Sequence, residues 1–503
     1  MKFKHLPIFF LLFSCGKENT ELNSGNSRIL SIPVLKSNNA EMQLSVERKI
    51  QNWFDQGSVW KWNDLSHEEL FAAIELSDGE FAVGLKFGGA NDSLPIEDLS
   101  RRSDWENLRE EILKGLEDTL TVEMGREVMR EDFVMEIDLH LPIISFKSKS
   151  PAIVAWLMVC KNIRYIEPLN DIVTLQVERT ESGCIPNYGA VHASDYITTG
   201  TGAKISWHWY YHNVPQAWGI RQGMGIGVGV IDAGVSSNQF LLFQQFNSGY
   251  SNVGRSHETT NTLGSSPYTS CNHGNAMAGL IAAPWANFGN TIGGAHKANL
   301  FTVRAADDVY LNTSAERLAV KNAYVYLANK SSVKIISMSM GTPFYSSVLL
   351  DAVTYASYMG KLLFAAAGTS TYYTSGLGVI YPAAFTECQA VTGIDDNDQT
   401  CQVCHDGPEV DFTVVMERSW DVNRKAVGIN QYNDWPQYVG GSSAATASAA
   451  AIAAIVWSTK PTLSKFQVLW ILRYTAQYPT IPNSEHGYGK LNALSAVQLA
   501  QQY

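Results

Sequence analysis

A short apolar run in the second half of the chain, residues 225–231, predicts a buried strand of a parallel sheet. After it come two stretches made almost wholly of small residues, 274–283 and 444–457, which predict helices buried in a large core. With 503 residues, 45% of them hydrophobic, the chain is long enough to form such a core. We therefore expect an α/β domain in this half.

The first half of the chain has a different pattern, with shorter elements in mixed order. It predicts a small α/β sandwich made of a strand, a helix, two strands, a helix and a last strand, at residues 81–87, 104–116, 133–139, 143–147, 151–160 and 165–168. Residues 16–50 are polar with little periodicity and are expected to form a tether. The following stretch contains Trp53, Trp60 and Trp62, so we expect it to be ordered, with no role assigned.

Three residues at the ends of these elements are candidates for acyl-transfer chemistry. Asp232 follows the apolar run, His273 precedes the first small-residue helix, and Ser443 precedes the second. A serine nucleophile needs a base to take its proton and an acid to orient that base. Each residue also has a simpler explanation: a turn-capping aspartate, a core histidine, and a helix N-cap at Ser442 or Ser443.

Taken together, the segments around these residues resemble the subtilisin-like serine proteases. The order Asp, His, Ser is that family's order. Residues 333–341 resemble the family's buried strand that leads into the substrate-binding backbone, and residues 360–368 resemble the strand that ends at its oxyanion asparagine. The resemblance covers roughly residues 205–500. It implies a three-layer α/β/α domain with a parallel sheet, acting on proteins or peptides through an acyl-enzyme.

The resemblance also implies the role of each site residue. Ser443 would be the nucleophile, His273 the general base and then acid, and Asp232 the residue that orients the imidazole. The expected substrate-binding residues, whose small wall would admit an apolar side chain, are Ser339, Met340, Gly341, Ala366, Ala367 and Gly368.

Several positions depart from the family's pattern. Thr369 stands where the family has its oxyanion asparagine, and the loss of such a donor costs about 10²–10³ in turnover. Asn275 and Ser442 replace threonines, and Ala447 replaces a proline. None of these changes removes a proton-transfer group. The alternative to an active endopeptidase is therefore a weak or inactive pseudoenzyme that keeps the fold and binds peptides.

Residues 80–178 resemble the family's inhibitory prodomain, a ferredoxin-like α+β domain, and residues 162–168 resemble its last strand. A generic accessory domain is the alternative. The resemblance implies a zymogen whose own prodomain is a partner. We divide the chain into a signal peptide, a lipidated cysteine with its tether, an extension, the prodomain, a linker with the processing site, and the catalytic domain, at residues 1–14, 15–50, 51–79, 80–178, 179–204 and 205–503.

The amino terminus predicts export. A basic start at Met1–His5 and an apolar run at Leu6–Phe13 too short to span a membrane lead to Cys15, and residues 12–15 resemble a bacterial lipobox. Cys15 would carry the lipid that anchors the protein to the membrane; an ordinary secretory signal is the alternative. Cleavage within residues 179–204 would release the catalytic domain, unless Cys160 and Cys184 link the two pieces.

The remaining composition limits cofactors and partners. A net charge of −11 argues against nucleic acid, and we expect a monomer. Cys401, Cys404 and His405 match a c-type haem attachment pattern, but a disulfide among Cys388, Cys401 and Cys404 is the simpler interpretation. No loop has the acidic spacing that identifies a metal site, so we expect no cofactor and leave calcium open, with residues 395–398 interpreted as a solvated acidic turn.

Overall fold

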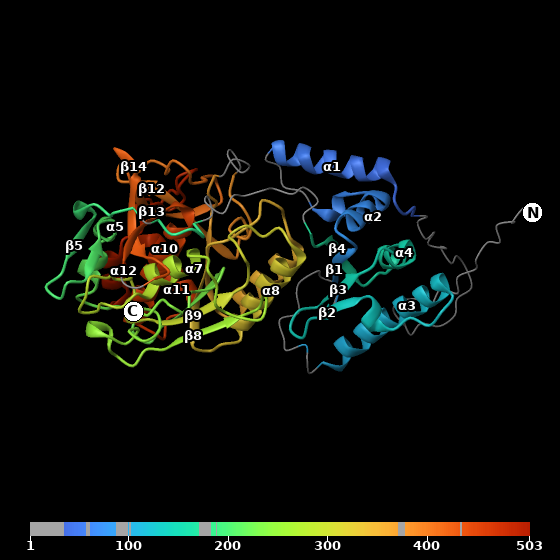
Figure 1. Ribbon diagram of the computed structural model, residues 1–503, viewed down its shortest axis with the longest axis horizontal. Helices are drawn as coiled ribbons and strands as arrows, with labels where there is room; N and C mark the ends of the chain where they lie inside the picture. The colour runs from blue at the N-terminus through green and yellow to red at the C-terminus, as the bar shows by residue number, and fades with distance from the viewer. Residues whose placement is uncertain are drawn as a thin grey trace, which may run out of the picture. The chain divides into compact units, whose positions relative to one another are not determined.

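The computed structural model describes residues 35–56, 61–86, 99, 102–170, 183–187, 189–370, 378–432 and 435–503. It contains two compact units, one formed by residues 1–49 and 61–172 and the other by residues 50–60 and 173–503 (Figure 1). The predicted signal peptide, Cys15 and the first part of the tether lie outside the described residues.

The first unit contains a four-stranded antiparallel sheet of order β2-β3-β1-β4 with two crossover helices. Phe146 packs between Phe81 and Phe133, with ring centroids 5.5 and 6.1 Å away, and anchors the core. The order strand, helix, strand, strand, helix, strand is ferredoxin-like, as the sequence predicted. The elements are β1 (Glu80–Leu85), α3 (Ser103–Met124), β2 (Val134–Ile137), β3 (Ile143–Lys147), α4 (Pro151–Val159) and β4 (Ile163–Pro168).

Two boundaries in this part of the chain differ from the prediction. Residues 40–50, predicted as tether, belong to helix α1 (Ala40–Asp55), because Met42, Val46 and Ile50 repeat every four residues and form an apolar stripe. Helix α3 continues to Met124, where Gly125 at φ +65° forms a left-handed cap. Helix α2 (His67–Leu76) lies in the stretch expected to be ordered and begins with a Ser66 capping box.

The second unit is built on a nine-stranded sheet of order β15-β14-β13-β12-β11-β10-β7-β9-β8. Seven strands are parallel, as predicted, but β13–β14 and β14–β15 pair antiparallel, because short connections allow only that arrangement. The strands are β7 (Gly227–Asp232), β8 (His257–Asn261), β9 (Asn299–Arg304), β10 (Val333–Met338), β11 (Leu362–Ala366), β12 (Cys388–Asp395), β13 (Val410–Arg418), β14 (Asp421–Ile429) and β15 (Pro436–Val439).

Helices cover both faces of this sheet and complete three layers. Helices α7 (His273–Ala282) and α10 (Gly441–Thr459) lie on one face, and α8 (Ser314–Ala328) and α9 (Ser347–Tyr358) on the other. The remaining described elements are α5 (His208–Tyr211), α6 (Val214–Ala217), α11 (Lys465–Thr475), α12 (Ala493–Ala500), the hairpin β5 (Tyr196–Thr198) and β6 (Lys204–Ser206), and the 3₁₀ turns η1 (Trp62–Asp64), η3 (Arg130–Asp132), η4 (Ala193–Asp195) and η5 (Gly249–Ser251).

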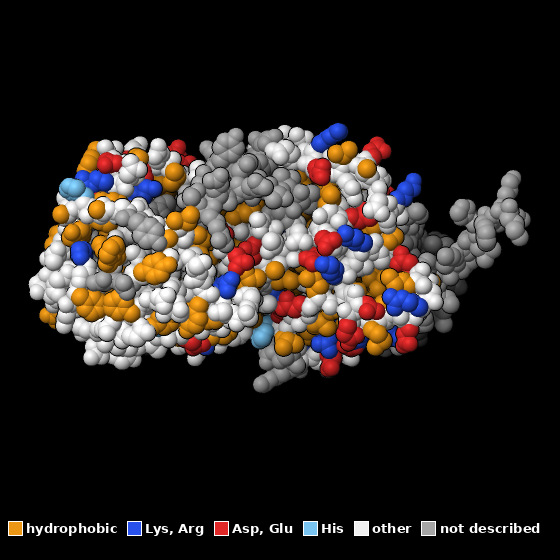
Figure 2. Space-filling view, viewed as in Figure 1, with side chains coloured by type: hydrophobic (Ala, Val, Ile, Leu, Met, Phe, Trp, Pro, Cys, Tyr) orange, Lys and Arg blue, Asp and Glu red, His pale blue; other side chains and the backbone are white. Residues whose placement is uncertain are grey.

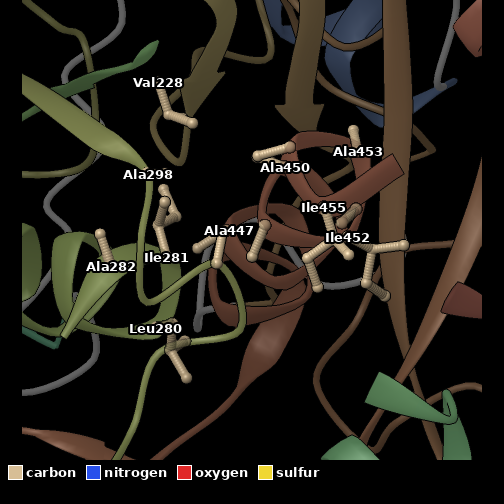
Figure 3. Packing of buried hydrophobic residues seen from close by; sticks show 14 of the residues in the cluster. Val228, Leu280, Ile281, Ala282, Ala298, Ala447, Ala450, Ile452, Ala453 and Ile455 are labelled. Carbon is tan, nitrogen blue, oxygen red and sulfur yellow. The ribbon is translucent and has the colours of Figure 1, made fainter. Parts of the chain in front are cut away.

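Helix α10 forms the centre of the core, as its small residues predicted. It is long and apolar enough to cross a membrane by length and composition, yet 94% of its apolar window is buried in the protein. Ala447 of α10 lies near Ile281 of α7 in Figure 3, and the small side chains let the two helices approach closely. A Cβ on Gly279 of α7 would come 2.3 Å from Ile429, so this helix is equally tightly packed.

The two units differ in surface character. In Figure 2, Lys, Arg, Asp and Glu side chains are dense on the visible face of the first unit, where helices α1 to α4 lie in Figure 1. The visible face of the second unit is mostly uncharged. Charged residues make up 17% of the whole chain. On the visible face they are denser on the first unit than on the larger second unit.

The packing of α10 predicts that it tolerates no added volume. Ala450→Leu, at a fully buried position, should lower the free energy of unfolding by about 1–3 kcal/mol through overpacking. Chemical denaturation in a Ser443→Ala background, which prevents self-digestion, measures the change. Gln498→Leu on the exposed side of α12 is the matched control and should change stability little; equal stability of all three proteins would contradict the packing described above.

Candidate active site

The candidate residues come together where neighbouring parallel strands end. Strands β11, β10 and β7 are adjacent in the sheet, and their carboxyl ends carry Thr369, Ser339 and Asp232 at one edge. His273 is the first residue of α7, and Ser443 lies in the first turn of α10. Residues of both helices and of the β10 and β11 ends line one cavity of about 530 Å³.

Asp232 and His273 form a buried hydrogen-bonded pair. The His273 Nδ1 atom lies 2.8 Å from Asp232 Oδ1 and 3.0 Å from Oδ2, and Oδ1 also accepts a hydrogen bond from the Ala233 amide. His273 is 5% exposed and Asp232 is 2% exposed, so water hardly competes for this contact. The carboxylate thereby fixes the ring so that Nε2 is the nitrogen available to the cavity.

The charge of Asp232 sets the titration of His273. Burial opposes the charged imidazolium, but the attraction and hydrogen bond of Asp232 outweigh it, so the pKa of His273 is raised above its ordinary value of 6.5. At His212 and His257 the effect of burial dominates and lowers the pKa of each to about 4. Among the buried histidines described, His273 thus combines a carboxylate partner with a raised pKa, which suits a proton-transfer group.

Ser443 is held at the start of α10 and turns its hydroxyl toward a backbone carbonyl. Its Oγ donates to Ser339 O at 3.2 Å, and Ser339 Oγ donates to Ser443 O at 2.9 Å. Within the described residues, no hydrogen bond joins Ser443 to His273. The N-cap of α10 is Gly440, so the N-cap interpretation of Ser442 or Ser443 was wrong: the helix begins earlier, at Gly441, whose φ of +73° suits glycine.

Thr369 lines the cavity and is linked to Ser442. Thr369 Oγ1 accepts a hydrogen bond from the Ser442 amide at 3.3 Å and lies 3.0 Å from Ser442 Oγ. Ser442 Oγ in turn accepts from the Gly368 amide at 3.2 Å. When Ser442 donates to Thr369, the Thr369 hydroxyl donates in turn to another acceptor.

The substrate-binding prediction fits the cavity at five of its six residues. Ser339, Met340, Gly341, Ala366 and Gly368 line the cavity together with Thr369. Ala367 does not, because it is fully buried: its amide donates to Val391 O, and its carbonyl accepts from the Ile380 amide. The alternation of side chains along an extended chain points this residue away from the cavity.

The disulfides exclude one cysteine pairing and confirm another. Cys184 pairs with Cys271, two residues before His273, so the Cys160–Cys184 link that the sequence left open does not form; Cys160 is buried and belongs to neither disulfide. Cys401 pairs with Cys404, as the simpler interpretation held, and this bond uses both sulfurs that haem attachment would need. The Cys184–Cys271 pairing could not be predicted from the sequence because it joins residues that are distant along the chain.

The Cys401–Cys404 loop is hydrogen-bonded to the segment that follows β11. The Ser370 amide donates to Val403 O at 2.6 Å, and the His405 amide donates to Gly368 O at 3.0 Å. A Cβ on Gly368 would come 2.2 Å from His405 Nδ1, so the loop packs directly against the Thr369 segment. Sequence reasoning missed His405 as a cavity residue, although its position beside the paired cysteines was a signal.

Comparison with known proteins now adds to this geometry. The model described as the subtilase family matches residues 223–489, just over half of the chain. The chain belongs to the subtilase family. Membership identifies it as a serine-type peptidase that acts on proteins or peptides.

This subtilase is 30% identical to thermitase of Thermoactinomyces vulgaris over 288 residues, covering 56% of this chain and 92% of thermitase. It is also 30% identical over 317 residues to a thermostable alkaline protease of Halalkalibacterium halodurans, covering 62% of this chain and 78% of that protein. Among solved structures, MycP1 from the ESX-1 type VII secretion system matches with 17% identity and a TM-score of 0.49, covering 64% of this chain and 90% of that one.

The carboxylates of the acidic turn at residues 395–398 pair with other groups of the protein. Asp396 pairs with Arg418 at 3.3 Å, and Asp398 pairs with Lys490 at 2.6 Å. Asp395 Oδ1 accepts hydrogen bonds from the Asn397 and Gln399 amides. In the part of the subtilase that is described, no group of three or more His, Cys, Asp or Glu residues has a metal-binding arrangement.

The pair at the centre of the site predicts a titration. Asp232→Asn removes the negative charge that counteracts the lowering of the His273 pKa by burial. The pKa of His273 should therefore fall below its ordinary value of 6.5. NMR titration of the His273 ring in a Ser443→Ala background measures this pKa. Asp308→Asn is the control, since Asp308 contributes least among the causes of the shift and should lower the pKa only slightly. An unchanged pKa in Asp232→Asn would show that another group charges the imidazole.

Proposed function

We propose that this protein is an exported serine endopeptidase, made as a zymogen, that cleaves peptide bonds with Asp232, His273 and Ser443. The observation that carries the proposal is the buried Asp232–His273 hydrogen bond in the same cavity as Ser443. A carboxylate, an imidazole and a hydroxyl in this order form a relay that moves one proton and stabilises the charge left behind.

Acylation begins with a rotation of Ser443. Turning about its Cα–Cβ bond releases Oγ from Ser339 O and brings it to His273 Nε2; such a rotation moves between ordinary staggered rotamers. Hydrogen bonds of this kind are often formed only when substrate is bound. The imidazole takes the hydroxyl proton as Oγ attacks the scissile carbonyl carbon, and Asp232 stabilises the imidazolium.

The carbonyl oxygen then becomes an oxyanion beside Thr369 and the first turn of α10. The Thr369 hydroxyl donates a hydrogen bond, and the amino end of α10 contributes the positive end of the helix dipole. His273 passes its proton to the leaving amine, the C–N bond breaks, and an ester of Ser443 remains. Water, deprotonated by His273, hydrolyses that ester and restores the serine.

The amino-terminal part of the chain supports the zymogen and export proposals. A ferredoxin-like unit precedes the protease unit, which is the arrangement expected of an inhibitory prodomain. One relative with 30% identity is named minor extracellular protease Epr, which favours export. We propose that Cys15 carries a lipid and that cleavage before the protease unit releases that unit from the membrane.

The position of the cut relative to Cys184 decides whether the anchored and released pieces separate. Cys160 belongs to neither disulfide of the described residues, and Cys184, which lies inside the proposed processing region, is bonded to Cys271. A cut before residue 183 therefore separates the anchored prodomain from the protease.

The second candidate function is that of a peptide-binding pseudoenzyme. Two observations favour it: Thr369 replaces the usual amide donor, and the Ser443 hydroxyl is bonded to Ser339 O. The intact Asp232–His273 pair favours the active enzyme. The following two experiments separate these functions.

Self-processing is the first test. Residues 16–503 should convert with time into a fragment that begins between about residues 170 and 204, whereas Ser443→Ala should stay full length, because the nucleophile is absent. Intact mass spectrometry follows both proteins, and a non-reducing gel should show free prodomain. A folded parent that stays full length would favour the pseudoenzyme or processing by another protease; free prodomain missing from the non-reducing gel after cleavage would exclude release.

The contribution of Thr369 is the second test. Thr369→Val keeps the shape but removes the hydroxyl, and should lower kcat by about 10² with KM little changed, because the donor acts on the transition state. Thr369→Ser should retain most of the activity. Steady-state kinetics on a peptide anilide measure both. If Thr369→Val kept the parent's kcat, Thr369 would not be the oxyanion donor.

A further inference from the structure

A short segment of the chain crosses the catalytic cavity and is covalently fixed there. Residues Gly183–Asn187, which we call the strap, contain Cys184, and its disulfide to Cys271 joins the strap to the residues just before His273. The Asn272 amide donates to Cys184 O at 2.8 Å, and the Asn187 amide donates to Gln437 Oε1 at 3.1 Å. The strap is therefore held at both ends, by the start of α7 and by β15.

The strap lies against the catalytic histidine. A Cβ added to Gly183 would come 3.3 Å from His273 Cδ2, so the backbone of Gly183 faces the imidazole ring directly. Gly183 has a φ of +75°, a conformation that glycine adopts readily. Gly183, Ile185 and Asn187 line the same cavity as His273 and Ser443.

The strap also separates this cavity from a second one. Cys184, Ile185 and Pro186 line a hollow of about 410 Å³ whose other walls include Arg304 and Asp307. Ile185 lines both hollows and is 53% exposed, an unusual position for a large apolar side chain. Without the strap, the two hollows would join into a longer groove past His273.

The chemistry of the site tells which half of the groove is covered. The acyl part of a substrate lies along Ser339–Gly341 and the small wall at Ala366, whereas the leaving amine takes its proton from His273 and departs past that ring. The strap contacts His273 and runs to Gln437 on β15, which leads into the start of α10. It therefore occupies the leaving-group half.

We propose that the strap narrows the leaving-group side of the cleft and makes the enzyme prefer small residues directly after the scissile bond. This inference rests on the proposed peptidase function. Cys184, Ala233 and Cys271 form a buried apolar cluster, so the disulfide is shielded and keeps the strap in place. Self-cleavage before residue 183 leaves the whole strap on the protease unit, with the disulfide still tying it to the start of α7.

The test compares two substrates that share every residue on the acyl side. One ends in p-nitroanilide directly after the scissile bond, and the other continues for several residues to a fluorescence quencher. The full-length protein is compared with Ile185→Ala, which keeps the disulfide, and with Cys184→Ser/Cys271→Ser, which releases the strap. Labelling of Ser443 by phenylmethanesulfonyl fluoride, with Ser443→Ala as the blank, counts active sites in each preparation.

The proposal expects the ratio of kcat/KM for the extended substrate over the anilide to rise by about tenfold in the double cysteine variant, equivalent to about 1.4 kcal/mol. Ile185→Ala should raise the ratio in the same direction. Anilide hydrolysis reports whether each variant is folded, so a double variant that fails to fold leaves Ile185→Ala to decide. Unchanged ratios in folded, labelled variants would overturn the strap proposal alone. A parent in which Ser443 is unlabelled and neither substrate is cut would overturn the proposed function, and the strap proposal with it.

Discussion

Asp232 and His273 can meet because no side chain stands between the end of β7 and the start of α7. A Cβ on Gly274 would come 2.0 Å from Gly234 O and 3.2 Å from Asp232 Oδ1, and Gly234 itself has a φ of +90°. Any larger residue at position 274 would push the helix away from the strand and break the 2.8 Å hydrogen bond. The raised pKa of His273, the direction of its Nε2 atom and the proposed use of Ser443 as a nucleophile all depend on this close approach.

The core extends the same constraint to the serine. Helix α10 carries alanine where most buried helices carry leucine, so it sits close to α7 and to the central strands. Ser443 is thereby placed over the end of β10, within hydrogen-bonding distance of Ser339 O, and Gly441 leaves room beside Thr369. The position of the Ser443 backbone is thus a consequence of core packing.

The strands and helices that carry Asp232, His273 and Ser443 could be predicted from sequence because apolar runs and small-residue stretches have direct structural meanings. Helix α1 could also have been found, since Met42, Val46 and Ile50 have helical spacing in an otherwise polar stretch. The antiparallel pairing of β14 and β15 and the partner of Cys184 depend on contacts distant in sequence, such as the 87-residue separation of Cys184 and Cys271, and no local pattern encodes them. The Ser443 rotamer and the Thr369–Ser442 hydrogen bonds require side-chain positions.

The central claim is that Ser443 forms an acyl-enzyme under the control of the Asp232–His273 pair. Rapid mixing with a chromogenic ester, followed by acid quenching and mass mapping of the peptides, tests it most directly. The account predicts a burst of product equal to the concentration of active sites, with the acyl group on Ser443 in the parent and on no residue in His273→Ala. Ester hydrolysis without a burst and with Ser443 unmodified would contradict it.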